Sequence, residues 1–175
     1  VPGYELRLLS PEGEPVPPGE AGDLWVKGDS ALAFYWHQHE KTKRSLRGEW
    51  FHTGDRYRMD EEGFFWYEGR SDDMIKVKGL WVSPIEIENR LMEHPAVREA
   101  AVVGVTVEGL TRIKAFVILR EGYAPSETLT RELQEWCKAK LRPYQYPELV
   151  VYVEDFPRTA TGKVQRFKLR ELREA

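Results

Sequence analysis

The residue types best suited to chemistry gather in one short segment, residues 69–79, which reads GRSDDMIKVKG. The segment places one arginine, two adjacent aspartates and two lysines between two glycines. Arginine and lysine are common partners of phosphates and other anions, including nucleotides. Aspartate, serine and glycine favour a bend in the chain. We therefore expect this segment to be a joint in the chain that also contacts a charged substrate.

A second candidate is the tripeptide Thr53-Gly54-Asp55, which follows a strand-like run. A carboxylate held at the end of a strand can accept hydrogen bonds from the two hydroxyl groups of a ribose. An ordinary aspartate turn explains the same three residues when they are considered alone.

The third candidate is the loop at residues 157–166, PRTATGKVQR, in which Lys163 follows a glycine. It is not a phosphate-binding P-loop, because that motif needs glycine in place of Pro157 and serine or threonine in place of Val164. The loop can still act as an arm that carries one ammonium group to a carboxylate or phosphate oxygen. Taken alone, Lys163 has the simpler interpretation of a solvated surface lysine.

Metal and disulfide chemistry find little support in the sequence. His37 and His39 have the spacing of half a metal site, but no third ligand accompanies them, so no metal centre is expected. The single cysteine, Cys137, excludes an intrachain disulfide and a cysteine zinc cluster and is expected in the core. A reducing, cytoplasmic setting fits this cysteine usage.

The charge balance argues against nucleic-acid and membrane partners. Lysine and arginine total 26 against 29 aspartates and glutamates, a net charge of −3. No apolar run approaches the roughly 18 residues that a membrane-spanning helix needs, and no signal-peptide pattern opens the chain. The basic residues at 163–173 are spaced with leucine and phenylalanine as in a solvated amphipathic helix.

The first part of the chain has the pattern of a β-rich unit. Alternating polar and apolar residues predict strands at 4–9 and 21–28, and a hairpin with an acidic, glycine-ended turn at 57–67. Residues 40–46 are expected to form a short helix. The six tryptophans are expected in the core or an interface, and Trp81 is the candidate to line a ligand channel.

The second part mixes strands and helices. A hairpin is predicted at 74–82 with its turn near Lys78-Gly79, and strands at 97–105, 113–119 and 149–153. A capping box, Ser83 with Glu86, and Pro84 predict a helix start. Two more helices are predicted, one with Leu129, Leu133, Trp136 and Leu141 on one side, started by Ser126 or Thr128, and one with Phe167, Leu169 and Leu172.

The predicted fold class is α+β, with a β-rich subdomain followed by a small domain in which helices flank a mixed sheet. A length of 175 residues allows one domain or two small ones. We expect the boundary at the charged joint, with residues 1–71 in the first part and 72–175 in the second.

The order and spacing of the motifs are more informative than each motif alone. Three motifs occur in a fixed order: Thr-Gly-Asp, then Gly-Arg-x-Asp-Asp-x-Ile-Lys-x-x-Gly before a Pro-x-Glu-Ile-Glu helix, then Pro-x-x-x-x-Gly-Lys-x-x-Arg. This arrangement resembles the adenylate-forming superfamily. This superfamily includes acyl-CoA synthetases, peptide-synthetase adenylation domains and luciferases. Residues 69–86, with the upstream Tyr35-Trp36 and the Gly48-Glu49-Trp50 run, look most like the benzoate–CoA ligase branch.

The resemblance also implies what this chain does not contain. Residues 1–71 look like the last, β-rich subdomain of the N-terminal adenylation domain, and residues 72–175 look like the mobile C-terminal domain. The phosphate loop, the adenine-binding segment and the acyl pocket of the family have no counterpart here. The chain opens on Val1 without a methionine. We therefore expect a C-terminal fragment that lacks the N-terminal domain and is inactive alone.

For the whole protein the resemblance implies an AMP-forming acid–thiol ligase. Such an enzyme converts a carboxylic acid, here an aromatic one, with ATP, Mg²⁺ and CoA into acyl-CoA, AMP and pyrophosphate through an acyl-adenylate. It implies no tightly bound cofactor in the fragment and no particular oligomeric state. The implied roles are catalysis for Lys163, nucleotide binding for Asp55 and Arg70, the hinge for Asp72, and the CoA-side loop for Lys76 and Gly79.

Two other functions remain open. The same motifs serve adenylation domains that load a carrier protein in place of CoA. A non-catalytic nucleotide-binding module that keeps only the nucleotide-facing residues is the alternative outside enzymes.

Overall fold

The computed structural model describes residues 2–172, and the chain forms two compact units, Val1–Asp72 and Asp73–Ala175. We call them unit 1 and unit 2. Unit 1 is β-rich and unit 2 mixes strands with helices, which confirms the predicted α+β class. None of the helices within residues 2–172 has the length and apolar character that crossing a membrane requires.

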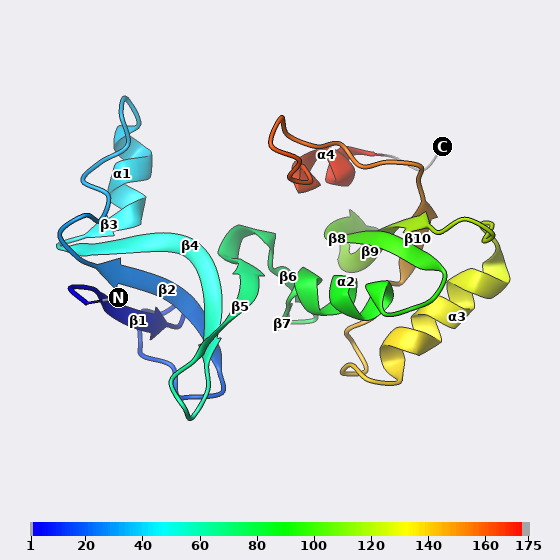
Figure 1. The fold of residues 1–175 in the computed structure, drawn as a ribbon, viewed down its shortest axis with the longest axis horizontal. Helices are drawn as coiled ribbons and strands as arrows, with labels where there is room; N and C mark the ends of the chain where they lie inside the picture. Colours follow the sequence, from blue (N-terminus) through cyan, green and yellow to red (C-terminus); the bar gives the residue numbers. More distant parts are fainter. Residues whose placement is uncertain (1, 173–175) are drawn as a thin grey trace. The chain divides into compact units, whose positions relative to one another are not determined.

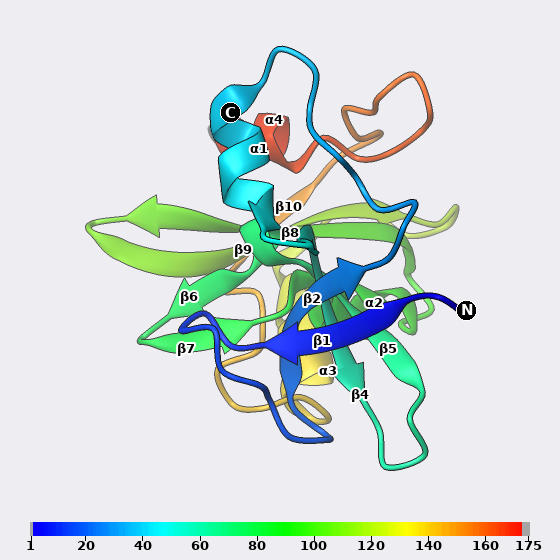
Figure 2. The same cartoon turned by 90° about the vertical axis from the view of Figure 1, so that its left-hand side faces the viewer.

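Unit 1 is one antiparallel sheet of five strands (Figures 1 and 2). The order is β1-β2-β4-β3, and β5 pairs with another part of β4. Its elements are β1 (Glu5–Leu9), β2 (Ala21–Lys27), α1 (His39–Ser45), β3 (Leu46–Arg47), β4 (Trp50–Met59) and β5 (Phe65–Arg70).

Strand β4 curves strongly along its length (Figure 1). Gly54 has a φ of +76° in the middle of the strand, and the pairing register shifts between Asp23 and Trp25 on β2 and between Arg56 and Tyr57 on β4. Such irregularities bend a strand and re-aim its side chains. The pairing beside the bend sets Asp55 directly opposite Arg70, so a local distortion brings two candidate residues together.

The β4–β5 hairpin turns where the acidic, glycine-ended segment predicted it. The Asp60 carboxylate accepts hydrogen bonds from the backbone N–H groups of Glu62 and Phe64 and, at 2.7 Å, from the Trp66 indole. The indole bond and then the Phe64 bond lower the pKa of Asp60. The turn is therefore closed by one side chain, as in an Asx turn.

Unit 2 contains a mixed three-stranded sheet in the order β10-β9-β8. β8 and β9 are antiparallel neighbours, whereas β10 runs parallel to β9. A separate hairpin precedes this sheet. The strands are β6 (Ile75–Val77), β7 (Leu80–Val82), β8 (Val97–Val107), β9 (Leu110–Leu119) and β10 (Leu149–Tyr152).

Helices cover both faces of the sheet in unit 2 (Figure 1). They are α2 (Pro84–Met92) and α3 (Glu127–Lys138) on one face and α4 (Arg166–Glu171) on the other. Side chains alternate along a strand, so Val102 packs in the cluster with α2 and α3 and Val103 packs in the cluster with Leu169 of α4. The sheet thus positions α4, and with it the loop that carries Lys163.

The helix starts were predicted with mixed success. Ser126 caps α3 by accepting a hydrogen bond from the Leu129 N–H at 3.1 Å, as predicted. Pro84 opens α2, but the Ser83 side chain makes no capping hydrogen bond, so the predicted capping box is wrong. The Glu86 carboxylate instead accepts a hydrogen bond from the Gln145 amide at 2.6 Å, because the tertiary fold offers this distant donor.

The burial of the tryptophans and the extents of two helices are decided by the structure. Among the tryptophans only Trp25 is buried, and Trp36 is 73% exposed. α3 ends at Lys138, so Leu141 lies beyond it. In α4 only Leu169 is buried, because the helix has just six residues and one contact face. Phe167 is exposed.

Cys137 is fully buried among the apolar residues of unit 2, as predicted. Burial raises the pKa of its thiol to about 11. Since the thiolate is the reactive form, at about pH 8 the folded thiol should react about 10²-fold more slowly than an unfolded cysteine of pKa about 8.5. Labelling the native and denatured chain with iodoacetamide checks this. Equal rates in the two states would contradict the buried placement.

Candidate functional site

The candidate nucleotide site of unit 1 is built around the Arg70 guanidinium at the end of β5. Its Nη1 group donates to Asp55 Oδ1 and to the Thr53 carbonyl oxygen, both at 3.2 Å. Its Nε group donates to Asp72 Oδ1, also at 3.2 Å. Three predicted site residues, Asp55, Arg70 and Asp72, therefore lie in one cluster.

Gly54 makes room for this arginine. A Cβ atom at Gly54 would lie 2.7 Å from the Arg70 Nη2 atom, and the φ of +76° is one that residues with side chains rarely adopt. A glycine in the Thr-Gly-Asp tripeptide is therefore favoured for two physical reasons. It allows the positive φ at the bend of β4, and it leaves space for the Arg70 guanidinium.

The ion pairs between Arg70 and the two aspartates are weak enough for a ligand to replace them. The Arg70 side chain is 45% exposed and that of Asp72 is 74% exposed. Partial burial by itself lowers the pKa of Arg70, but Asp72 and then Asp55 outweigh it and raise the pKa overall. Exposed ion pairs of this kind contribute about 0–1 kcal/mol. A phosphate or a ribose can therefore compete for these groups at small cost.

A second polar cluster, which the sequence did not reveal, surrounds Asp23 on β2. Its carboxylate accepts hydrogen bonds from the Ser71 hydroxyl at 2.8 Å and from Arg56 at 3.3 Å, and His52 Nε2 lies 3.6 Å away. Burial alone raises the pKa of Asp23, but His52, Ser71 and Arg56 together lower it below its ordinary value. Ser71 begins the short 3₁₀ helix Ser71–Asp73, so Asp23 anchors the joint to unit 1.

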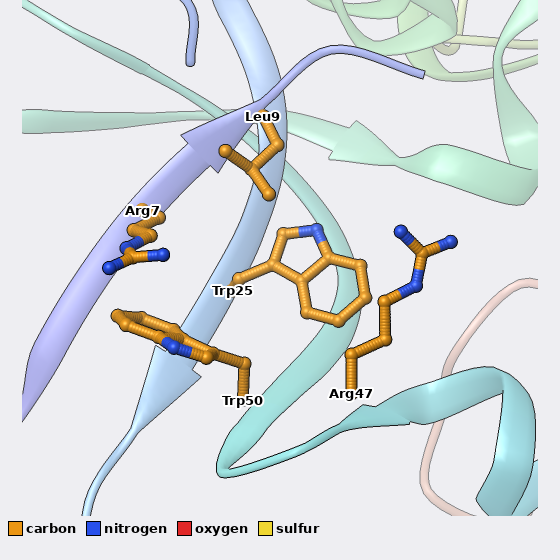
Figure 3. Close-up of a pocket in the computed structure, with 5 residues that line it drawn as sticks. All are labelled: Arg7, Leu9, Trp25, Arg47 and Trp50. Carbon is orange, nitrogen blue, oxygen red and sulfur yellow. The ribbon is translucent and has the colours of Figure 1, made fainter. Parts of the chain in front are cut away.

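A hollow of about 160 Å³ lies on one face of the sheet of unit 1 (Figure 3). The Arg7 guanidinium lies 4.0 Å from the ring centre of Trp50, and that of Arg47 lies 5.2 Å from Trp25. The Trp25 ring also stacks on His52 at 4.8 Å. The aromatic surfaces are already occupied by side chains of this unit, which favours a structural stack.

The hairpin β6–β7 carries two predicted site residues, Lys76 and Gly79. Lys78 and Gly79 have φ values of +49° and +87°, the left-handed conformations of a type I′ turn. The Lys76 ammonium lies 5.3 Å from the centre of the Trp81 ring, and both side chains are exposed. The hairpin therefore presents a cation, an aromatic ring and an unhindered glycine backbone on one small surface.

Lys163 lies in a closed loop of unit 2. The Thr159 N–H donates to the Lys163 carbonyl oxygen at 2.8 Å, and the Lys163 N–H donates to the Thr159 hydroxyl at 3.1 Å. Gly162 supplies a φ of +83° for the turn. The Lys163 side chain is exposed and makes no ion pair within residues 2–172. The backbone is thus ordered while the ammonium remains available.

The candidate residues form three groups. Asp55, Arg70 and Asp72 lie together in unit 1, whereas Lys76 with Gly79 and, separately, Lys163 belong to unit 2. Within residues 2–172 no group of three or more histidine, cysteine, aspartate or glutamate side chains is arranged to hold a metal ion.

A known protein family matches much of unit 2. Residues 86–163 match the family described as the AMP-binding enzyme C-terminal domain. This segment of unit 2 is similar to the C-terminal domain of AMP-binding enzymes. This confirms the resemblance to adenylate-forming enzymes that the motifs predicted.

Individual AMP-binding enzymes match nearly the whole chain. The benzoate–CoA ligase of Thauera aromatica is 49% identical over 97% of this chain, and the 4-hydroxybenzoate/benzoate–CoA ligase of Rhodopseudomonas palustris is 44% identical over 98%. The matches cover 33% and 32% of those proteins. The chain therefore spans about a third of the length of these relatives.

Solved structures agree with this assignment. A benzoate–CoA ligase from Burkholderia xenovorans matches with a TM-score of 0.89 at 50% identity over 97% of this chain and 34% of that chain. An anthranilate–CoA ligase in complex with anthranoyl-AMP matches with a TM-score of 0.89 at 47% identity over 98% of this chain and 33% of that chain. The chain thus resembles the C-terminal part of aryl-CoA ligases in sequence and in structure.

Proposed function

We propose that this chain is the C-terminal third of an AMP-forming aryl-CoA ligase. The whole enzyme first joins an aromatic carboxylate to the α-phosphate of Mg–ATP, which releases pyrophosphate. The thiol of CoA then attacks the acyl-adenylate, the bond to AMP breaks, and the thioester forms. The observation that carries the proposal is the match of 44–49% identity to two benzoate–CoA ligases over 97–98% of the chain.

The surface of unit 1 supports the need for a further part of the protein. Leu8 and Trp25 are the buried apolar side chains of residues 2–72, and both clusters of buried apolar residues belong to unit 2. Apolar surface exposed to this extent marks an interface. The exposed large side chains of unit 1 are Tyr4, Leu6, Phe34, Trp36, Phe64, Trp66 and Tyr67.

In this proposal Asp55 and Arg70 bind the nucleotide. The Asp55 carboxylate accepts hydrogen bonds from the ribose hydroxyls, and the Arg70 guanidinium donates to the ribose and phosphate region. Their 3.2 Å contact supports this assignment, because it holds both groups at one place. The partial exposure of both side chains leaves them accessible.

Lys163 is assigned to adenylation, in which its ammonium contacts the substrate carboxylate and the α-phosphate. A positive charge placed where negative charge develops stabilises the transition state. The ordered backbone and the exposed side chain of Lys163 support this assignment. No nucleophile from the protein is required in either step.

Asp72 is assigned as the hinge about which unit 2 moves between the two steps. Lys76 and Gly79 then belong to the surface used in thioester formation, where the glycine lets the backbone approach the pantetheine arm. The position of Asp72 at the end of unit 1 and the small exposed hairpin at the start of unit 2 support these roles.

The test is acid-dependent exchange of pyrophosphate into ATP by the full-length protein that the proposal requires. Benzoate and hydroxybenzoates should support exchange, and 4-hydroxybutyrate should support it poorly. CoA should then yield acyl-CoA and AMP. The isolated 175-residue chain should show neither reaction. Absence of exchange with every aromatic acid would overturn the proposal.

The same assay separates the alternatives. A carrier-protein-loading enzyme would transfer the acyl group to a phosphopantetheinyl carrier in preference to CoA. A nucleotide-binding module would bind AMP as the isolated chain, which calorimetry measures. We place the reaction in the cytoplasm, since ATP and CoA are its substrates and the one cysteine is a free thiol.

A further inference from the structure

We propose that Glu88 is a positioning residue for Lys163, acting through Arg166. This inference rests on the proposed role of Lys163 in adenylation. Glu88 belongs to α2, yet it is only 7% exposed and does not join the apolar cluster beside it. A buried carboxylate is costly unless it is paired and hydrogen-bonded, so its partners are decisive.

Glu88 lies where it can join both faces of the sheet. β8 is the edge strand of the order β10-β9-β8, and the Val102 N–H of that strand donates to Glu88 Oε1 at 2.7 Å. From α4, the Nη2 group of Arg166 donates to both carboxylate oxygens, at 2.8 and 2.7 Å. Because α2 and α4 cover opposite faces, this carboxylate ties α4 to the rest of the unit around the sheet edge.

Arg166 is the first residue of α4 and follows Lys163 by three positions. The Gln165 N–H donates to the Pro157 carbonyl oxygen at 2.8 Å, and Arg158 and Val164 form a β-bridge. These bonds close the loop at its base. A shift of Arg166 is therefore passed to Lys163 through a short, hydrogen-bonded segment.

The other side of the loop is held by a weaker pair. Arg158 donates to Glu99 at 2.6 Å, but these side chains are 31% and 39% exposed. The side chains of Arg166 and Glu88 are 22% and 9% exposed. Exposed pairs are screened by water, whereas loss of one partner of a buried pair is strongly felt. We therefore assign the principal anchor of the Lys163 loop to Glu88.

The same anchor connects to the start of unit 2. Asp73 lies 3.7 Å from Arg166 and accepts a hydrogen bond from Arg170 at 2.9 Å. Asp73 directly follows the proposed hinge residue. The cluster of Glu88, Asp73, Arg166 and Arg170 thus carries equal numbers of positive and negative groups and couples the Lys163 loop to the first residue of the moving unit.

The test compares Glu88→Gln with Glu99→Gln, which removes the exposed pair of the same loop. Hydrogen exchange of residues 157–165 in the chain should be about tenfold faster in Glu88→Gln and within about twofold of wild type in Glu99→Gln. Exchange within β8 and β9 should stay unchanged, except at the Val102 amide that donates to Glu88. Unchanged exchange of the loop in Glu88→Gln would overturn the proposal.

The kinetic arm uses the full-length enzyme. Glu88→Gln should lower the rate of acyl-adenylate formation about 10–100-fold, as expected for a misplaced catalytic group. Thioester formation from supplied acyl-adenylate should remain within about twofold, a difference that general destabilisation would not produce. Equal loss of both steps would overturn the positioning role.

Two further outcomes are distinguishable. If the wild-type enzyme forms no adenylate, the proposed function fails and the positioning role with it, while hydrogen exchange still decides whether Glu88 anchors the loop. If Glu88→Gln fails to fold, the double variant Glu88→Gln/Arg166→Gln removes the pair without leaving a buried unpaired charge. That variant is expected to show the same loop-specific exchange, and its absence would overturn the anchor.

Discussion

Lys163→Ala in the proposed full-length ligase is expected to lower the rate of acyl-adenylate formation by about 10²–10³-fold, the usual effect of removing one group that stabilises developing charge. The side chain is exposed and makes no ion pair within residues 2–172, so its removal should leave the fold unchanged. Thioester formation from supplied acyl-adenylate should be spared. Single-turnover measurement of each half-reaction checks this.

Lys168→Ala is the matched control for this variant. Lys168 is an exposed lysine on α4, close in the chain to Lys163 and outside its loop. Both half-reactions should keep wild-type rates in this control. If Lys163→Ala slowed both half-reactions equally, the assignment of Lys163 to adenylation would be wrong.

Asp72→Pro is expected to slow one half-reaction about tenfold more than the other, because in the proposed mechanism the two steps need different positions of unit 2. Proline locks φ near −65° and removes an N–H donor. Asp72 lies within the 3₁₀ helix Ser71–Asp73, between the Asp23–Ser71 hydrogen bond on one side and the Asp73 ion pairs on the other. If Asp72 is the hinge that we propose, proline would restrict rotation at this position.

Asp72→Ala separates the backbone effect from the loss of charge. It removes the carboxylate that accepts the 3.2 Å hydrogen bond from Arg70 but leaves φ free. The ratio of the two half-reactions should stay close to wild type in this variant. Unchanged kinetics of both steps in Asp72→Pro would rule out the hinge assignment.

Elements with local signals were predicted well from the sequence. The β6–β7 turn was predicted from Lys78-Gly79, because a glycine adopts positive φ without strain. The start of α3 was predicted from Ser126, whose hydroxyl bonds to an N–H three residues away. In each case the residues that decide the conformation are close neighbours in the chain.

Predictions failed where a distant group competes for the same atoms. Glu86 was expected to cap its own helix, but it accepts a hydrogen bond from Gln145, 59 residues away. The tryptophans were expected in the core or an interface, and the sequence did not decide between the two: Trp25 is buried, whereas Trp36 and Trp66 are exposed, because unit 1 has little apolar core within residues 2–72. Neither outcome can be inferred from local pattern.

The sequence alone indicated the resemblance to adenylate-forming enzymes, the α+β class and the candidate site residues, because these depend on residue types at fixed spacings. The tertiary structure alone decided which polar and charged groups meet. Ser71 reaches Asp23 across 48 residues, and Arg166 reaches Glu88 across 78. The reason is physical: a buried carboxylate must be paired, and which arginine or hydroxyl can reach it depends on how sheets and helices pack.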